Sequence, residues 1–232
     1  MNVIDIKNLS FGYFSEHDVL KNVNMQVKEG DFLCIVGENG SGKSTLIKCI
    51  LGLNKVTKGE INVNGRIGYL PQMTEVQNNF PATIEEIVLS GTLPDNIKRI
   101  FYTKEDKQKA KETMEKLQLY EMRKKCFYEL SGGQKQRVLI ARSLCATDKI
   151  ILLDEPVNGL DPKIVIEIYE LLQKLNREHG ITIVMVSHDV ERAVQYATRV
   201  IEIKNGQVTK DIAASEYGTG GASKWLKLYK KC

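Results

Sequence analysis

Nine consecutive residues carry the strongest chemical signal in this chain. They match the pattern G-x-x-x-x-G-K-[ST] without a mismatch, and they are Gly37, Glu38, Asn39, Gly40, Ser41, Gly42, Lys43, Ser44 and Thr45. Glycines let such a loop curl so that its backbone amides face an anion at the start of a helix. Lys43 adds a positive charge for β- and γ-phosphates, and the Ser44 hydroxyl can hold Mg²⁺. The run therefore predicts a phosphate-binding loop.

The flanking residues supply the elements that this loop needs. Residues 32–36 form an apolar run typical of a buried strand, and residues 45–51 have the apolar spacing of a helix. The alternative is a glycine-rich turn before an ordinary core helix. The order of strand, glycine-rich turn and helix favours phosphate binding over that alternative.

Two adjacent acids follow another predicted buried strand. The apolar run 150–153 leads straight into Asp154 and Glu155. Such a pair suits Mg²⁺ chemistry, with one carboxylate for the water shell of the metal and the other to activate or orient a water molecule. A solvated strand end is the weaker interpretation, because four apolar residues run directly into both acids.

Two more polar residues also follow predicted strands. His188 comes after the apolar run 181–186, and Gln72 comes after a short strand that a proline ends. Ligands of open α/β sheets bind at the carboxyl ends of the strands, which favours a catalytic role for His188. Gln72 could ligate Mg²⁺ or position a water molecule. A satisfied loop histidine and an ordinary polar loop residue remain the alternatives.

A second turn could also bind an anion. Ser131, Gly132, Gly133 and Gln134 precede a helical run at residues 138–144. A Ser-Gly-Gly turn that opens a helix offers free backbone N–H groups to a negative charge. Taken alone, such a turn is a weak indication.

An aromatic cluster lies between the first two predicted strands, at residues 11–14. Within it, Tyr13 could offer a flat ring on which a base stacks. From this segment alone, an ordinary core aromatic is the favoured interpretation.

The composition limits the class of protein. Among 232 residues, 42% are apolar and 27% charged, as in a soluble globular protein. No apolar run approaches the ~18 residues of a membrane span, and no signal peptide is recognisable, so we expect a cytosolic protein that could dock on a membrane protein. The net charge of +4 is too small to indicate nucleic acid as a partner. Five cysteines without a C-x-x-C pair predict free thiols.

The order of elements predicts a strand-rich domain with a helical insertion. Strand patterns disappear between residues 73 and 130, where helical spacing takes over. We expect strands at 3–9, 23–27, 59–65 and 67–72, and helices at 84–90, 104–119 and 164–175. The chain after residue 212 predicts a flexible link and a short amphipathic end.

The motifs in this order resemble the nucleotide-binding subunit of ATP-binding cassette (ABC) transporters, from about residue 3 to residue 212. The resemblance implies an α/β fold with a P-loop NTPase (RecA-like) core, an N-terminal antiparallel β-subdomain and an inserted helical subdomain. The implied ABC ATPase domain covers 1–212, with 1–72 and 150–212 as catalytic core plus β-subdomain and 73–149 as helical subdomain with the signature motif. Residues 213–232 would be a C-terminal tail.

The resemblance also implies a role for each motif residue. Residues 37–45 would cradle the phosphates of ATP, and Ser44, Gln72 and Asp154 would contact Mg²⁺. Glu155 would be the general base for water, with Gln72 and His188 as further catalytic residues.

Other implied roles concern the nucleotide and a second subunit. Ser131, Gly132, Gly133 and Gln134 would reach the γ-phosphate held by the other subunit of a dimer, and Asp161 would belong to the D-loop. Tyr13 would stack on adenine, which reverses the interpretation made from its segment alone. Val157 and Asn158 depart from the family, which usually has a threonine or serine after the Glu-Pro pair.

The implied function is ATP hydrolysis that drives transport through a separate multi-span permease. The subunit would act as a head-to-tail homodimer around ATP and Mg²⁺, peripheral on the cytoplasmic face of the cell membrane, with an extracytoplasmic substrate-binding protein as a further partner. Residues 65–72 and 80–91 look like those of bacterial zinc/manganese importers. Importers of iron chelates or vitamins, and soluble ABC ATPases such as iron–sulfur assembly factors, are the alternatives.

Overall fold

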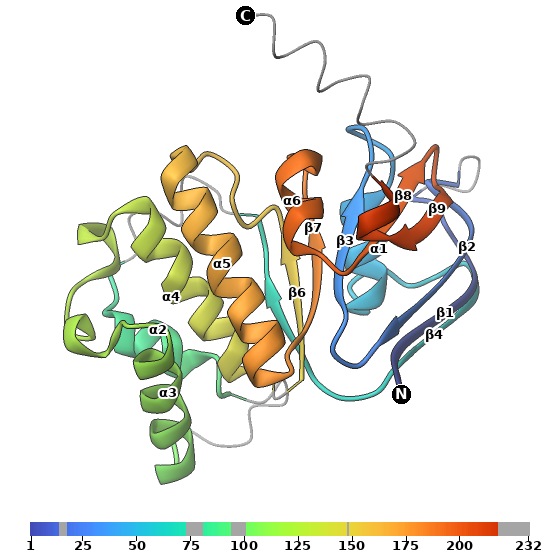
Figure 1. Ribbon diagram of the computed structural model, residues 1–232. Coiled ribbons are helices and arrows are strands. Elements are labelled where there is room, and N and C mark those ends of the chain that lie inside the picture. Colours follow the sequence, from blue (N-terminus) through green and yellow to red (C-terminus); the bar gives the residue numbers. More distant parts are fainter. Residues whose placement is uncertain (14–17, 73–80, 94–100, 148, 218–232) are drawn as a thin grey trace, which may run out of the picture.

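The computed structural model describes residues 1–13, 18–72, 81–93, 101–147 and 149–217 (Figure 1). Residues 218–232 of the predicted C-terminal tail and residues 73–80 of the predicted helical subdomain lie outside the described residues. Three parts follow one another across the molecule: a helical part, a six-stranded sheet and a three-stranded sheet (Figure 1).

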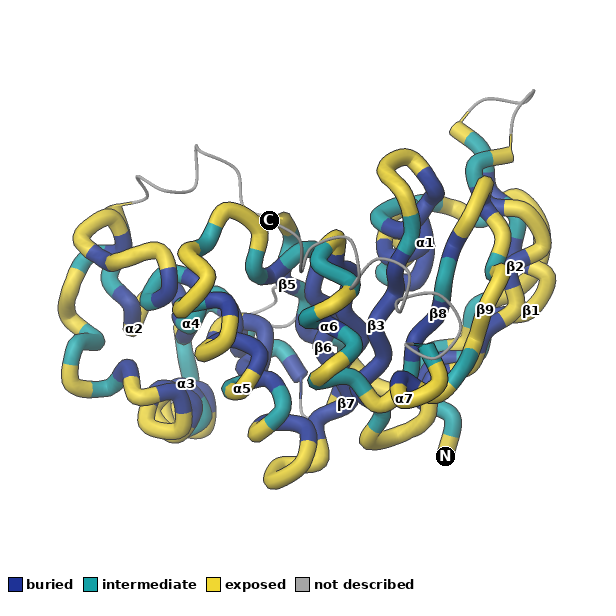
Figure 2. Tube along the Cα trace, turned by 45° about the horizontal axis from the view of Figure 1, so that its top comes forward, coloured by how far each residue is buried: buried dark blue, intermediate teal, exposed yellow. Residues whose placement is uncertain are grey.

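The six-stranded sheet forms the centre of the protein. Its strands lie in the order β5 (Ile67–Leu70), β6 (Ile150–Asp154), β7 (Thr182–Val186), β3 (Phe32–Val36), β8 (Arg199–Lys204) and β9 (Gln207–Ala213). The first five run parallel, and β9 pairs antiparallel with β8 in a hairpin. All residues of β3, β6 and β7 are buried, as parallel strands covered on both faces require (Figure 2). The predicted α/β fold class is confirmed.

The central strands divide the apolar core between two faces. Alternate residues point to opposite sides of a strand, so Ile151 and Leu153 of β6 join the cluster formed with α4 (Gly132–Cys145) and α5 (Pro162–His179). Ile150 and Leu152 join the other cluster, formed with α1 (Lys43–Ile50) and the smaller sheet.

The smaller sheet is the predicted N-terminal antiparallel subdomain. Its strands are β2 (Leu20–Lys28), β1 (Asn2–Phe11) and β4 (Lys58–Val63), in that order. Val23, Met25 and Val27 of β2 are buried while the residues between them are exposed, as the alternation in the sequence predicts.

The helical part lies at the end of the molecule opposite the smaller sheet (Figure 1). It contains α2 (Ile84–Ser90), α3 (Lys104–Lys116), the 3₁₀ turns η2 (Tyr120–Met122) and η3 (Phe127–Glu129), and α4. Thr83, Thr103 and Ser131 each begin a helix with a reciprocal capping box, which satisfies backbone N–H groups that the first turn leaves unpaired. This arrangement fits the predicted helical insertion.

The C-terminal part of the described chain stays attached to the core. Helix α5 covers the predicted helix 164–175 and extends it at both ends, up to the left-handed Gly180 with φ 65°. Helix α6 (Val190–Tyr196) follows β7, and α7 (Ala214–Tyr217) follows β9 with Ala214 buried. The prediction of a flexible link after residue 212 is therefore wrong for residues 213–217, because these end β9, form α7 and pack on the core.

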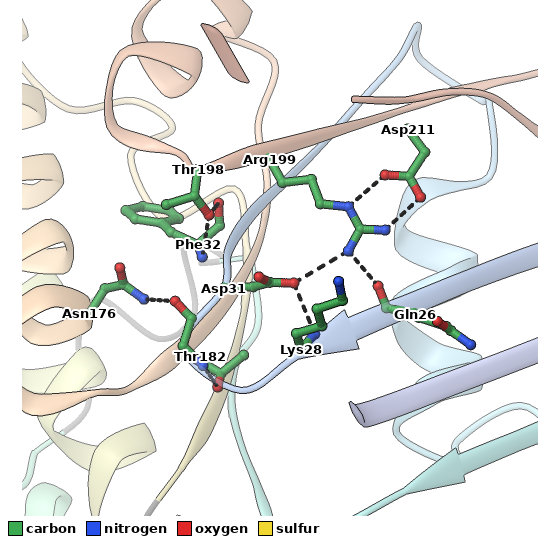
Figure 3. Close-up of polar contacts among 10 residues, drawn as sticks. Gln26, Lys28, Asp31, Phe32, Asn176, Thr182, Thr198, Arg199 and Asp211 are labelled. Carbon is green, nitrogen blue, oxygen red and sulfur yellow. Dashed lines mark hydrogen bonds and ion pairs between the residues drawn. The ribbon is translucent and has the colours of Figure 1, made fainter. Parts of the chain in front are cut away.

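Polar side chains join the two sheets at the amino-terminal ends of the parallel strands (Figure 3). Arg199 donates from Nε and Nη2 to the two carboxylate oxygens of Asp211, both at 2.6 Å, and from Nη1 to the Gln26 carbonyl at 2.7 Å and to Asp31 at 3.3 Å. The hydrogen bond and charge of Asp211 raise the pKa of Arg199. We call Gln26, Asp31, Arg199 and Asp211 the Arg199 cluster.

Four of the five cysteines lie in described parts of the chain, and all four are free thiols, as predicted. Cys34, Cys49 and Cys145 are buried. Burial raises the pKa of Cys34 to about 12 and that of Cys49 to about 11, and it also raises the pKa of Cys145.

Candidate functional site

The predicted phosphate-binding loop connects β3 to α1. Gly37 has φ 152°, and a Cβ there would lie 2.2 Å from the carbonyl oxygen of Ile203, so only glycine fits. Gly42, with φ 107°, is the N-cap of α1. Lys43 Nζ donates to the carbonyl oxygens of Gly37 at 2.9 Å and Glu38 at 2.8 Å, which holds the ammonium group inside the loop.

This loop concentrates groups that suit an anion. Lys43 is only 5% exposed, and desolvation lowers its pKa, so a bound negative charge would offset the cost of burying the ammonium group. Within the described part of the chain, the buried Ser41 Oγ has no hydrogen-bonding partner. A buried hydroxyl without a partner is unfavourable, and a phosphate oxygen would satisfy it.

The acid that ends β6 lies next to the same loop. Asp154 is 5% exposed, and its Oδ1 accepts a hydrogen bond from Ser44 Oγ at 3.3 Å. Desolvation raises the pKa of Asp154, so its carboxylate is short of compensating positive charge. Two oxygen ligands side by side fit Mg²⁺, which prefers carboxylate and hydroxyl oxygens. The structure thus brings Ser44 and Asp154 together, as predicted.

The second acid is held by groups from three other places in the chain. Glu155 has a left-handed backbone, with φ 53°, and its side chain is 9% exposed. Oε2 accepts from Gln72 Nε2 at 2.9 Å and from Asn158 Nδ2 at 3.1 Å, and Oε1 contacts His188 Nε2. The three residues predicted to be catalytic therefore meet at one point. Asn158 was missed as a contact, although it follows Glu155 by three residues in a tight turn.

The Ser-Gly-Gly turn begins α4 as predicted. Ser131 Oγ accepts from the Gln134 backbone N–H at 3.4 Å, and Gln134 Oε1 accepts from the Ser131 backbone N–H at 3.1 Å. A Cβ on Gly133 would lie 2.6 Å from Ile164 Cγ2, so this glycine allows the turn to pack against α5. Within the described residues, no hydrogen bond joins this turn to the phosphate-binding loop.

Asp161 lies in the same region as the turn. Its carboxylate caps α5 by accepting a hydrogen bond from the Lys163 backbone N–H at 3.0 Å. In the same loop, Leu160 Cδ2 lies 3.2 Å from the Cβ that Gly132 lacks. The loop before α5 and the Ser-Gly-Gly turn therefore pack as one unit.

Tyr13 lies above the start of α1. Its ring is 53% exposed, its hydroxyl is 3.4 Å from Thr45 Oγ1, and its edge meets Phe11 at 5.0 Å between ring centroids. The hydrogen bond to Thr45 lowers the pKa of Tyr13. The core aromatic of this cluster is Phe11, at 7% exposed, so that interpretation is wrong for Tyr13. An exposed ring beside the loop is free to stack on a base.

An apolar cavity of about 470 Å³ lies between α2, α4 and the end of β5. Its lining is mostly hydrophobic and includes Tyr69, Leu70, Pro71, Ala82, Ile87, Phe127 and Leu139. Gln72 directly follows this lining, so one side of the cavity leads to the carboxylate of Glu155. Among the residues that the structure describes, no helix has the length and hydropathy to span a membrane.

Comparison with known proteins agrees with this geometry. The family described as ABC transporter matches residues 20–158. A metal transport system ATP-binding protein of Thermotoga maritima is 38% identical over 82% of this chain and 76% of its own length. The zinc uptake system ATP-binding protein ZurA of Listeria innocua is 37% identical (93% and 87%), and the phosphonates import ATP-binding protein PhnC of Staphylococcus aureus is 36% identical (93% and 91%).

Solved structures show the same architecture. A metal-chelate type ABC transporter in an inward-facing conformation matches 93% of this chain and 85% of its own, with a TM-score of 0.82 and 30% identity. A dimeric bacterial ABC transporter cassette matches 91% of this chain and 98% of its own, with a TM-score of 0.74 and 34% identity. With the phosphate-binding loop, the paired acids and the Ser-Gly-Gly turn in place, this chain belongs to the ABC transporter family and is an ATP-binding, Mg²⁺-dependent ATPase subunit.

Proposed function

We propose that this ATPase powers the import of zinc, manganese or a related metal ion through a separate membrane permease. It would act as a homodimer on the cytoplasmic face of the cell membrane, with an extracytoplasmic protein delivering the metal. The observation that carries the ATPase part is the Glu155 carboxylate, held by Gln72 and His188 beside Asp154. The proposal for the transported substrate is based on the names of the similar proteins.

The roles in ATP hydrolysis follow from the contacts. The backbone amides of residues 37–45, with Lys43 and Ser41, would bind the phosphates. Ser44, Gln72 and Asp154 would hold Mg²⁺, which when bound neutralises charge on the phosphates. Glu155 would accept a proton from the attacking water, because its left-handed backbone and three neighbours fix the carboxylate at the strand edge.

A second subunit would complete each site. Ser131 and Gln134 are at least partly exposed at the start of α4 and make no hydrogen bond to the phosphate-binding loop within the described residues. In a head-to-tail dimer, this turn would meet the γ-phosphate bound by the partner. Phosphoryl transfer depends on charge stabilisation around the whole group, which one loop alone leaves open. The dimeric cassette among the related structures supports this arrangement.

The apolar cavity would receive the permease. Its hydrophobic lining and its position between two helices suit a short amphipathic helix laid in a groove. Gln72 links this groove to Glu155, so a movement at the permease would reach the ATP site. A soluble ABC ATPase, such as an iron–sulfur assembly factor, would not bind a membrane permease and so would not need such a groove for one.

A second candidate substrate is a phosphonate, because the Staphylococcus aureus relative is almost as similar as those named for metals. Importers of iron chelates or vitamins remain alternatives. Uptake of radioactive zinc, manganese and a phosphonate should be measured in cells that lack this gene and in cells complemented with wild type or Glu155→Gln. Loss of zinc or manganese uptake, restored only by wild type, is the expected result. Loss of phosphonate uptake alone would contradict the metal proposal.

One substitution tests the groove directly. Ala82 lines the cavity and is half-buried, so Ala82→Glu should place a charge in the groove and abolish co-purification with the permease. ATP hydrolysis by the isolated subunit and its Tm should stay near wild type. Glu85→Arg is the matched control, because Glu85 is exposed on α2 outside the cavity lining. Glu86 is unsuitable, since it caps α2 through Thr83.

Co-purification of the Ala82→Glu subunit with the permease at the wild-type level would place the docking site elsewhere. Unfolding of the isolated variant would show that the segment is core.

A further inference from the structure

One buried hydroxyl lies outside the residues that carry the proposed roles in hydrolysis. Tyr169 of α5 is 0% exposed and is among the largest fully buried side chains described. Its ring stacks on Tyr196 of α6, with 5.0 Å between centroids and planes 8° apart. Packing explains the ring, but a phenylalanine would pack as well. A buried tyrosine hydroxyl needs a hydrogen-bonding partner.

The partner of this hydroxyl is Ser187, at the carboxyl end of β7. The Tyr169 hydroxyl lies 3.2 Å from Ser187 Oγ, and Ser187 is 2% exposed. Ser187 Oγ also accepts from the Asp189 backbone N–H at 3.1 Å. Ser187 therefore links α5 to the turn formed by residues 187–189, in which His188 is the middle residue.

The hydrogen-bonding groups around Ser187 suit a contact that holds the turn 187–189 in one position. Burial raises the pKa of Tyr169, so its hydroxyl stays protonated and can donate to Ser187. Ser187 can then donate to the Asp189 carbonyl oxygen, 3.4 Å away. Asp189 in turn caps α6 by accepting from the Arg192 backbone N–H at 3.2 Å. The turn is thus bonded to two helices, while the His188 side chain remains 42% exposed.

We propose that Tyr169 is a positioning residue for His188. Its hydroxyl holds Ser187, and through Ser187 the turn that keeps His188 Nε2 against the carboxylate of Glu155. Asp161, six residues after Glu155, is the N-cap of α5, so the same helix joins the loop after the general base to the turn that contains His188. This inference rests on the proposed catalytic role of His188.

The experiment removes the hydroxyl and keeps the ring. In the full-length chain, Tyr169→Phe should lower kcat for ATP hydrolysis roughly tenfold, because small displacements of a catalytic group are costly. KM for ATP should not change, since within the described part of the chain no hydrogen bond joins the Tyr169 or Ser187 side chain to the phosphate-binding loop or to Tyr13. Tm should change by less than about 4 °C. Tyr196→Phe keeps the stacked pair and should leave kcat at the wild-type value.

A double-mutant cycle tests whether Tyr169 acts on kcat through its hydrogen bond with Ser187. Ser187→Ala should lower kcat at least as much as Tyr169→Phe does, because it also removes the hydrogen bond from the Asp189 backbone N–H. The double variant should be no slower than Ser187→Ala, in which the contact between Tyr169 and Ser187 is already lost. A Tyr169→Phe variant with wild-type kcat would overturn the inference, and so would additive losses in the double variant. Parallel losses in kcat, ATP affinity and Tm would indicate general destabilisation and would also overturn it.

The substitution His188→Ala separately tests the proposed catalytic role of His188, on which the inference about Tyr169 rests. It should lower kcat more than Tyr169→Phe does, because it removes the side chain that contacts Glu155. If His188→Ala hydrolyses ATP like wild type, the proposed role of His188 is wrong, whatever Tyr169 does. If His188→Ala is slow and Tyr169→Phe is not, only the inference about Tyr169 fails.

Discussion

Charged side chains are paired at the amino-terminal ends of the parallel strands and are short of compensating charge at the carboxyl ends. At the amino-terminal ends, Arg199 pairs with Asp211 through two hydrogen bonds of 2.6 Å and also donates to Asp31 at 3.3 Å. At the carboxyl ends, Asp154 and Glu155 are adjacent acids, and the pKa of Asp154 is raised because its carboxylate is desolvated. One end satisfies its charges internally, and the other keeps groups that a ligand would satisfy.

This difference separates stability from activity. A satisfied cluster of charges that bridges two sheets holds the fold together. Acids, a buried ammonium group and a hydroxyl without a partner cost stability until a ligand binds. We therefore expect substitutions in the Arg199 cluster to weaken the fold and leave hydrolysis intact, and substitutions at the carboxyl ends to do the reverse.

The largest effect should come from Glu155→Gln, which keeps the shape and removes the base. Hydrolysis should fall by about 10²–10⁴-fold, the range for general base catalysis, while ATP binding persists. Steady-state turnover and gel filtration with ATP and Mg²⁺ measure the two effects, and the variant should elute as a dimer. Turnover at the wild-type rate would remove Glu155 from the role of base.

Tyr13→Ala should weaken ATP binding by ~1–3 kcal/mol, because it removes the exposed ring on which adenine would stack. Tyr13→Trp should change the affinity little, since it keeps a flat aromatic surface. Equilibrium titration with a fluorescent ATP analogue measures both. Wild-type affinity in Tyr13→Ala would show that the base binds elsewhere. Thermal unfolding without ATP should be the same for all three proteins.

Arg199→Met should lower the free energy of unfolding by about 1–2 kcal/mol, because it leaves the half-buried carboxylate of Asp31 and the more exposed carboxylate of Asp211 without this partner. At this chain length, that predicts a fall in Tm of about 2–8 °C, with kcat at 25 °C unchanged. Lys210→Met is the control on the same hairpin, since its pair with Glu202 is more exposed and should contribute less than about 1 kcal/mol. Equal losses in both variants would contradict a special role for the cluster.

The smallest change in stability should be a gain. Because desolvation raises the pKa of Asp154, folding disfavours its charged form, and Asp154→Asn removes that charge while it keeps an acceptor for Ser44. We expect the free energy of unfolding in Mg²⁺-free buffer to rise by about 0.5–1 kcal/mol, while Mg²⁺-dependent hydrolysis is lost. A lower stability than wild type would show that the carboxylate is compensated in the native state.

The site was predictable where its residues follow one another in the chain or end a strand. The phosphate-binding loop, Asp154 and Glu155 needed only an apolar run and the residues after it, because parallel strands bring their carboxyl ends to one edge. Gln72 and His188 needed the same rule, and the structure brings both to Glu155.

The Arg199 cluster was not predictable from the sequence. Arg199 meets Asp31 and Gln26 across separations of 168 and 173 residues, and no local pattern indicates which strands become neighbours. The apolar cavity depends in the same way on Leu139 of α4 meeting Pro71 after β5. Tyr13 and Phe11 share one short segment, and only the packing of the two sheets decides which of them is exposed.

The buried thiols give the protein a built-in reporter of its own opening. Burial raises the pKa of Cys34 to about 12, so the thiol stays protonated at pH 7, and only the thiolate reacts with alkylating reagents or soft metal ions. Cys49 is similarly protected in the same native state. Alkylation of these two cysteines therefore requires local or global unfolding, and the alkylation rate measures how often the core is exposed. ATP, by binding only the closed fold, should slow that labelling in proportion to its affinity.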